Sequence, residues 1–209
     1  MTDGSRGRLI AFEGIDGCGK STQARVLASR LGALLTFEPG ATPLGNQLRG
    51  LLLDAGLPPL TDRAEALLMA ADRAQHVAEV VVPALDGGNW VVTDRFSGST
   101  LAYQGYGRGL DLGELARLVD WATAGLHPDL TVLIEVPTDM AGTRLPGGRH
   151  DRFEALGADF HQRVADGFHR LAADDPESWT VVDGTGSVDD VSESVWSVVR
   201  ERLGVPTGD

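Results

Sequence analysis

Lys20 is the only lysine in this chain, and it lies in a glycine-rich stretch whose residue types and spacing could bind phosphate groups. Residues 14–22 read GIDGCGKST, which fits the pattern G-x-x-x-x-G-K-[ST] directly after an apolar run and at the start of a helical pattern. Glycines let backbone N–H groups turn toward phosphate oxygens, and the helix that follows adds its positive end. The stretch therefore predicts an ATP-binding loop formed by Gly14, Ile15, Asp16, Gly17, Cys18, Gly19, Lys20, Ser21 and Thr22.

The lysine itself supports this interpretation, because every other one of the 18 Lys and Arg residues is arginine. A compact ammonium on a flexible stem can reach the β- and γ-phosphates over the loop, whereas a planar guanidinium has the wrong shape. We expect Lys20 to be catalytic and Ser21 to offer its hydroxyl to Mg²⁺. Cys18 is interpreted as a small filler rather than a redox switch. A glycine-rich turn that binds nothing is the alternative for the whole loop.

The composition excludes several classes of function. The chain has 209 residues, a formal net charge of −12 and one cysteine. An anionic surface repels nucleic-acid backbones and acidic lipids, so we expect neither a nucleic acid nor a membrane as a partner. The apolar runs are too short to span a bilayer, and no signal peptide is visible. A single cysteine fits a reducing compartment, so we expect a cytoplasmic protein.

Apolar strands alternate with amphipathic helices, which predicts a single α/β domain over residues 1–209 with a five-stranded parallel sheet covered on both faces. The expected strands are 8–14, 33–37, 89–94, 130–136 and 179–183. The expected helices are 20–31, 44–54, 61–85, 112–124, 153–173 and 188–203. Residues 1–7 and 204–209 are expected to be flexible tails. Ligands of such sheets bind at the carboxyl ends of the strands, where we expect the chemistry to lie.

Asp94 and Arg95 stand at such a position, at the end of the third expected strand. An aspartate there can hold the water shell of a metal ion, and an arginine can fork onto a phosphate. A purely structural ion pair is the alternative.

Three further stretches extend the pattern: EPGATPLGNQLRGLLL after the second strand, LLMAADRAQHV in the long helix, and TDRFSGSTLAYQGYGRGL after the third strand. Together with the phosphate loop, these resemble bacterial thymidylate kinase in order and spacing from about Leu9 to Asp183. The resemblance implies a P-loop, three-layer α/β/α fold with a small mobile lid. It also implies transfer of the γ-phosphoryl group of Mg²⁺-ATP to dTMP, giving dTDP and ADP, and a homodimer.

The resemblance implies roles for residues near the acceptor phosphate. Arg95 would grip both the acceptor phosphate and the transferred phosphoryl group, and Arg49 would bind the acceptor phosphate. Asp16 would meet the 3′-hydroxyl of the acceptor sugar and lie near the metal. Ser21, Asp94 and Asp16 are thus the expected metal residues.

The resemblance also implies the residues that face the acceptor base and sugar. Arg73 would read a thymine carbonyl, and Met69 stands where the family usually has a phenylalanine that stacks on the base. Thr100, Tyr103 and Gln104 would face the base and the sugar, with Tyr103 as the wall against a 2′-hydroxyl. Without the resemblance, Met69 would be interpreted as core and Arg73 as a solvated charge.

The stretch TRLPGGRHDRFE, residues 143–154, matches the family's lid, which we place at about 142–153. The phosphate loop has no arginine of its own, so the lid is expected to supply the catalytic arginine. We assign this role to Arg149, with Arg144 as its substitute and as a contact to ATP. A solvated loop without function is the alternative.

Two departures from the family pattern bear on the acceptor. Phe37 and Ala41 stand where the family commonly reads REPGGT, so a cation near the acceptor phosphate is missing, and Arg49 is expected to carry more of that role. Three other functions remain open: a kinase for a different nucleoside monophosphate, a phosphate-loop switch or motor, and a catalytically weakened nucleotide-binding module. The second lacks support, because a chain whose sole lysine is Lys20 has no N-K-x-D motif.

Overall fold

The computed structural model describes residues 6–144 and 151–205. Its centre is a parallel sheet of five strands in the order β2-β3-β1-β4-β5. The strands are β1 (Leu9–Glu13), β2 (Leu34–Phe37), β3 (Val91–Asp94), β4 (Leu130–Glu135) and β5 (Trp179–Asp183). The central strand β1 is buried along its whole length, and Ile10 pairs with Val92 on one side and Leu130 on the other. This confirms the predicted number and direction of the strands.

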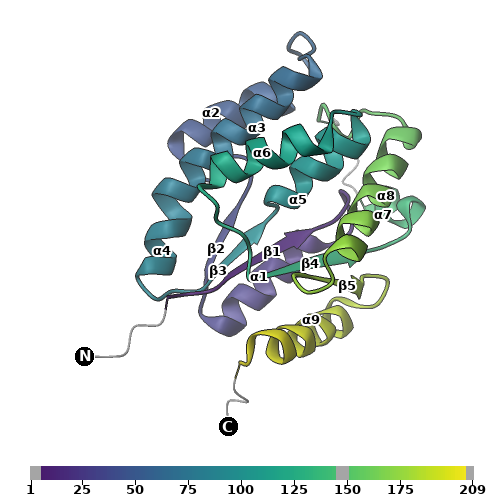
Figure 1. Cartoon of the computed structure of the whole chain (residues 1–209). Coiled ribbons are helices and arrows are strands. Elements are labelled where there is room, and N and C mark those ends of the chain that lie inside the picture. The colour runs from purple at the N-terminus through teal and green to yellow at the C-terminus, as the bar shows by residue number, and fades with distance from the viewer. Residues whose placement is uncertain (1–5, 145–150, 206–209) are drawn as a thin grey trace.

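Helices cover both faces of the sheet. On one face, α1 (Lys20–Leu31) packs against α9 (Val188–Leu203). On the other face lie α3 (Asp62–His76), α5 (Ser97–Thr100), α6 (Leu112–Thr123) and α8 (Ala158–Asp174), with α2 (Pro43–Leu53) packed against α3 (Figure 1). In the described part of the chain, no helix combines the length and the apolar character needed to cross a bilayer.

Local chemistry explains several helix ends. The Thr61 side chain accepts a hydrogen bond from the Ala64 N–H and caps α3, as its position in the sequence predicts. Gly32 takes the left-handed conformation that ends α1. At α9, Ser187 and Asp190 form a reciprocal capping box.

The long helix expected over 61–85 is divided into α3, the π-helical segment η1 (Val77–Val81) and α4 (Val82–Asp86). Pro83 lies in the first turn of α4, and a proline cannot donate the hydrogen bond that a continuous α-helix needs. The helix expected from Phe153 was placed too early, because α8 begins at Ala158. Before it, the Asp151 carboxylate accepts hydrogen bonds from the Phe153 and Glu154 N–H groups and holds a turn.

Two helical segments were not predicted. One is α5 with the π-helical η2 (Leu101–Gly107), in a stretch rich in glycine and serine without a clear apolar period. The other is α7 (Thr138–Arg144). The first matters for function, because it follows β3 and carries several of the expected acceptor residues.

Candidate active site

The phosphate loop joins β1 to α1 and forms one wall of a cleft. Gly14 has φ +141°, and a side chain at Gly17 would collide with the backbone of Ala141, so glycine is required at both positions. The Lys20 ammonium donates to the Ile15 carbonyl at 3.2 Å and to the Asp16 carboxylate at 3.3 Å. The opposite wall includes residues that follow β5, namely Gly184, Gly186 and Ser187. The cleft is therefore built for a phosphate chain at the start of α1.

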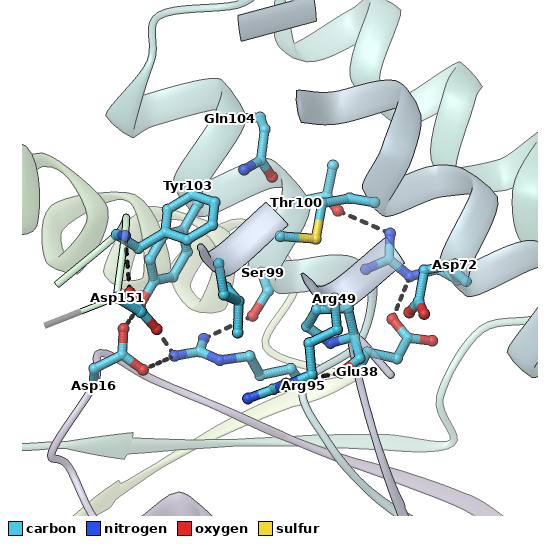
Figure 2. Close-up of a pocket in the computed structure, with 15 residues that line it drawn as sticks. Asp16, Glu38, Arg49, Asp72, Arg95, Ser99, Thr100, Tyr103, Gln104 and Asp151 are labelled. Carbon is cyan, nitrogen blue, oxygen red and sulfur yellow. Dashed lines mark hydrogen bonds and ion pairs between the residues drawn. The ribbon is translucent and has the colours of Figure 1, made fainter. Parts of the chain in front are cut away.

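A second pocket opens on the other side of the phosphate loop, between β3, α3 and η2 (Figure 2). All the predicted acceptor residues line it, although they come from separate parts of the chain: Asp16, Arg49, Met69, Arg73, Arg95, Thr100, Tyr103 and Gln104. His76, which lies on α3 seven residues after Met69, is fully buried and does not line the pocket.

Asp16, Arg95 and Tyr103 form a cluster in the second pocket, next to the phosphate loop to which Asp16 belongs (Figure 2). Arg95 Nη2 donates to Asp16 Oδ1 at 2.5 Å and to the Tyr103 hydroxyl at 3.0 Å. The Tyr103 hydroxyl in turn donates to Asp16 Oδ2 at 2.9 Å. The Tyr103 ring is held edge-on by Phe153, Phe160 and Phe168. An ion pair and a tyrosine hydroxyl are thus fixed between the phosphate loop and the second pocket.

The charges in this cluster stabilise each other. Burial alone would raise the pKa of Asp16, but the positive charges of Arg95 and Lys20 outweigh it and hold that pKa well below its ordinary value. Burial opposes the charge of Arg95, yet Asp16 raises the pKa of its guanidinium well above the ordinary value. Burial also raises the pKa of Tyr103 well above its ordinary value, so its hydroxyl remains a donor.

Glu13 holds the turn that presents Arg95, and sequence reasoning did not single it out. Its carboxylate accepts from the Phe96 N–H at 3.0 Å, the Ser99 N–H at 2.9 Å and the Ser99 hydroxyl at 2.6 Å. The Ser99 hydroxyl accepts from Arg95 Nη1 at 2.9 Å. Arg95 itself has φ +71°, an unfavourable conformation for a residue with a side chain. Glu13 is the last residue of β1, and this position at the carboxyl end of a strand is the signal that could have revealed it.

The side of the second pocket formed by α3 and Thr100 is held by a buried network around Arg73. This arginine donates through Nε to Glu38 at 2.8 Å, through Nη1 to the Thr100 hydroxyl at 2.8 Å and through Nη2 to the Phe96 carbonyl at 2.9 Å. His76 contacts the other oxygen of Glu38 at 2.8 Å. Further lining residues that the sequence did not predict are Glu38, Pro39, Leu53, Asp72, Ser99, Asp151 and Phe153.

Phe37 lies outside this pocket, with its ring half exposed beside the guanidinium of Arg49. Arg49 donates to the Pro39 carbonyl at 2.7 Å and lines the pocket. Phe37, which stands where the family commonly has an arginine, therefore packs against Arg49, the arginine that this chain retains.

Comparison with known proteins gives this geometry a context. A protein-family model described as thymidylate kinase matches residues 12–195. The chain belongs to the thymidylate kinase family. Thymidylate kinases of Synechococcus sp. (strain CC9902) and Geobacter sp. (strain M21) are 50% and 47% identical to it. Each alignment covers 94% of this chain, and 99% and 93% of the two relatives.

A solved structure agrees. The crystal structure of thymidylate kinase from Ehrlichia chaffeensis superimposes with a TM-score of 0.78 at 32% identity, covering 93% of this chain and 99% of that one. The resemblance, the P-loop α/β fold and the kinase activity expected from the sequence are confirmed. The chain is an ATP-dependent kinase that phosphorylates dTMP to dTDP.

The family resemblance also implies Mg²⁺, and two of the three expected residues fit it. Ser21 lines the nucleotide cleft. Asp94 lines neither pocket, but its Oδ1 is buried and has no hydrogen-bond partner among residues 6–144 and 151–205, which suits an oxygen that holds a metal's water shell. Asp16 fits less well, because both of its oxygens are engaged by Arg95, Lys20 and Tyr103.

The expected lid is described only at its two ends, because Arg149 belongs to residues 145–150, which lie outside the described part of the chain. Arg144 lines the nucleotide cleft and donates to the Gly184 carbonyl at 3.1 Å. Arg152 lines neither pocket and donates to three carbonyl groups in the loop after α2. Of the lid arginines that the structure describes, Arg144 is the one that lines the cleft beside the phosphate loop.

Asp72 gives the kinase a pH-dependent stability. Its carboxylate accepts from the Gly40 N–H at 3.0 Å, and burial, followed by the negative charge of Glu38, raises its pKa to about 6. Between the ordinary value near 3.8 and about 6, the folded protein retains a proton that the unfolded chain releases. The free energy of unfolding therefore falls as the pH rises through this window.

We expect Asp72→Asn to escape this loss, because an amide does not titrate. Thermal unfolding measured at about pH 4.5 and about pH 8 should show the midpoint of the variant rising relative to wild type at the higher pH. Asp174→Asn, at an exposed position on α8, is the control and should show no such change. An equal difference at both pH values would mean that Asp72 does not titrate there.

Proposed function

We propose that the phosphoryl group passes from ATP to dTMP at the cluster of Asp16, Arg95 and Tyr103. The position of Asp16 carries this proposal, because it belongs to the phosphate loop and also lines the second pocket. ATP would lie in the cleft beside α1 and dTMP in the pocket beside η2. Their phosphates would then face each other across the Asp16–Arg95 ion pair.

Charge neutralisation and alignment supply the catalysis. The acceptor phosphate is already an anionic oxygen nucleophile, so no strong general base is required. Lys20 binds the β- and γ-phosphates, and Arg95 forks onto the acceptor phosphate and the transferred group. Asp16 holds both cations at the junction. The contact of Asp16 with Lys20, at 3.3 Å, is longer than its contact with Arg95, at 2.5 Å. Lys20 would therefore lose the weaker of the two contacts when its ammonium turns toward a phosphate.

Two further contributions complete the nucleotide side. Ser21 and Asp94 would hold Mg²⁺, which neutralises charge on the β- and γ-phosphate oxygens when bound. Arg149 is proposed as the catalytic lid arginine, and Arg144 as an ATP contact that could replace it. A cation that arrives late stabilises the charge spread over the transferred group.

The acceptor side selects the nucleotide. Arg73 has five N–H donors, of which three bind partners in the described part of the chain, so the other two could face a thymine carbonyl. Met69 packs on the base, while Thr100 and Gln104 border it. The buried ring of Tyr103 forms the wall against a 2′-hydroxyl. Arg49 lies where it could reach the acceptor phosphate.

The test is a coupled ADP-release assay across a panel of monophosphates, with and without Mg²⁺. We expect dTMP to give the highest kcat/KM and the rate to require Mg²⁺. A preference for dUMP or dCMP would support the rival monophosphate kinase that Met69 and Phe37 suggest. ATP binding without ADP release would support a weakened nucleotide-binding module.

We also propose that the chain forms a single domain and acts as a homodimer in the cytoplasm. Trp121 on α6 is 82% exposed, and Leu67 on the neighbouring α3 is 58% exposed. Such large apolar side chains on adjacent helices favour burial against a second copy. Sedimentation velocity that returns the mass of one chain at working concentration would contradict the dimer.

A further inference from the structure

A buried polar cluster lies behind the base side of the acceptor pocket. Glu65 on α3 is 1% exposed, and its Oε1 accepts from Gln104 Nε2 at 2.9 Å. Arg108, directly after η2, donates to the same carboxylate through Nη2 at 2.7 Å and through Nε at 3.2 Å. Gln104 is the member of the cluster that lines the pocket.

This arrangement leaves the Gln104 amide one orientation. A carboxylate paired with a guanidinium is an acceptor at both oxygens, so only the amide nitrogen of Gln104 can face Glu65. The amide oxygen is then left for the pocket. In Figure 2 this oxygen lies on the side of Gln104 nearer Thr100.

We propose that Glu65 is a positioning residue for base selection, which turns the Gln104 carbonyl oxygen toward the acceptor base. The inference rests on the proposed function in one respect, namely that Gln104 borders the base. Glu65 does not line the pocket, yet its contact with Gln104 explains why the pocket presents a hydrogen-bond acceptor at this point.

The resulting order of donors and acceptors suits one class of pyrimidine. Thymine and uracil present an N3–H donor beside the C4 carbonyl acceptor, which match the Gln104 oxygen and the N–H groups of Arg73. Cytosine presents a bare N3 acceptor beside a C4 amino donor, so both contacts would be repulsive. Sites built on such hydrogen bonds discriminate strongly, because a mismatch leaves buried polar groups unpaired.

Glu65→Gln tests the proposal because it preserves size while removing one acceptor. The longer contact, from Arg108 Nε to Oε1 at 3.2 Å, would be lost, and the shorter contact, from Arg108 Nη2 to Oε2 at 2.7 Å, would retain the single oxygen of the new amide. Its nitrogen would then face Gln104, whose own amide must reverse to accept from it. The pocket would receive a donor where wild type has an acceptor.

We expect the ratio of kcat/KM for dTMP over dCMP to fall about ten- to a hundredfold in this variant, mainly through the KM for dTMP. The ratio for dTMP over dUMP should stay constant, since those two nucleotides share the N3–H and C4 carbonyl and differ by the methyl group. Asp62→Asn is the matched control. It removes a carboxylate 3.5 Å from Arg108 but leaves Glu65 intact, and should preserve both ratios.

Gln104→Ala separates this inference from the proposed function. If Gln104→Ala leaves the dTMP to dCMP ratio unchanged, the contact between Gln104 and the base is wrong. If it lowers the ratio and Glu65→Gln does not, the positioning role of Glu65 is wrong. Adding Glu65→Gln to Gln104→Ala should lower the ratio no further, and a further loss would overturn the inference. Equal losses of kcat/KM with dTMP, dUMP and dCMP in Glu65→Gln would leave both ratios unchanged, and would overturn the inference in favour of a general distortion of the pocket.

Discussion

We expect the Lys20→Met variant to lose turnover by about 10³-fold or more, because it removes the one ammonium that reaches the phosphates over the loop. The side chain is 7% exposed, and its Nζ donates to the Ile15 carbonyl and to the carboxylate of Asp16, which lines the acceptor pocket. A methionine fills a similar volume without charge. The coupled ADP-release assay at saturating dTMP measures the loss.

Two further variants give this prediction its controls. Lys20→Arg retains the charge and should still be severely impaired, since a planar guanidinium does not fit the position of the ammonium. Arg25→Ala removes a charge from an exposed position on the same helix and should leave turnover unchanged. Product formation at the wild-type rate by Lys20→Met would overturn the assignment of the phosphate loop.

Arg95→Met is expected to lower kcat/KM for dTMP by about 10³- to 10⁵-fold, the range found when an arginine that stabilises a transferred phosphoryl group is removed. Arg95 contacts Asp16, Tyr103, Ser99 and the Gly14 carbonyl, so one guanidinium organises the whole junction. ATP affinity should change little, because Arg95 lines the acceptor pocket and not the cleft beside α1. Steady-state kinetics and ATP titration separate these two effects.

Arg95→Lys distinguishes the charge from the shape of the side chain. It preserves the positive charge but has no fork with which to hold Asp16 and Ser99 together, so we expect only partial recovery of kcat/KM. Arg117→Ala, on the exposed face of α6, serves as the control for removal of a surface arginine. Full activity in Arg95→Lys would show that the fork plays no part in aligning the phosphates.

Much of the fold could be predicted from the sequence because its signals are local. The five strands appear as apolar runs, and the ends of α1 and α3 are marked by Gly32 and Thr61. The phosphate loop is equally local, since its glycines and Lys20 lie within nine consecutive positions of the printed motif. The rule that ligands bind at strand ends then indicated Asp94 and Arg95. Recognition of the family supplied the other acceptor residues, which the pocket brings together from separate elements.

The remaining features depend on contacts between residues that are far apart in the sequence. Glu13 meets Ser99, Arg73 meets Glu38, and Glu65 meets Gln104 only because parallel strands and packed helices place them side by side. A buried carboxylate and its donor leave no periodic pattern in the chain, since each is a single polar residue within an apolar or mixed segment. The local sequence thus determined the phosphate loop and the order of the elements. Packing decided which charges became partners, because burial makes an unpaired polar group costly and so selects the arrangement that satisfies each one.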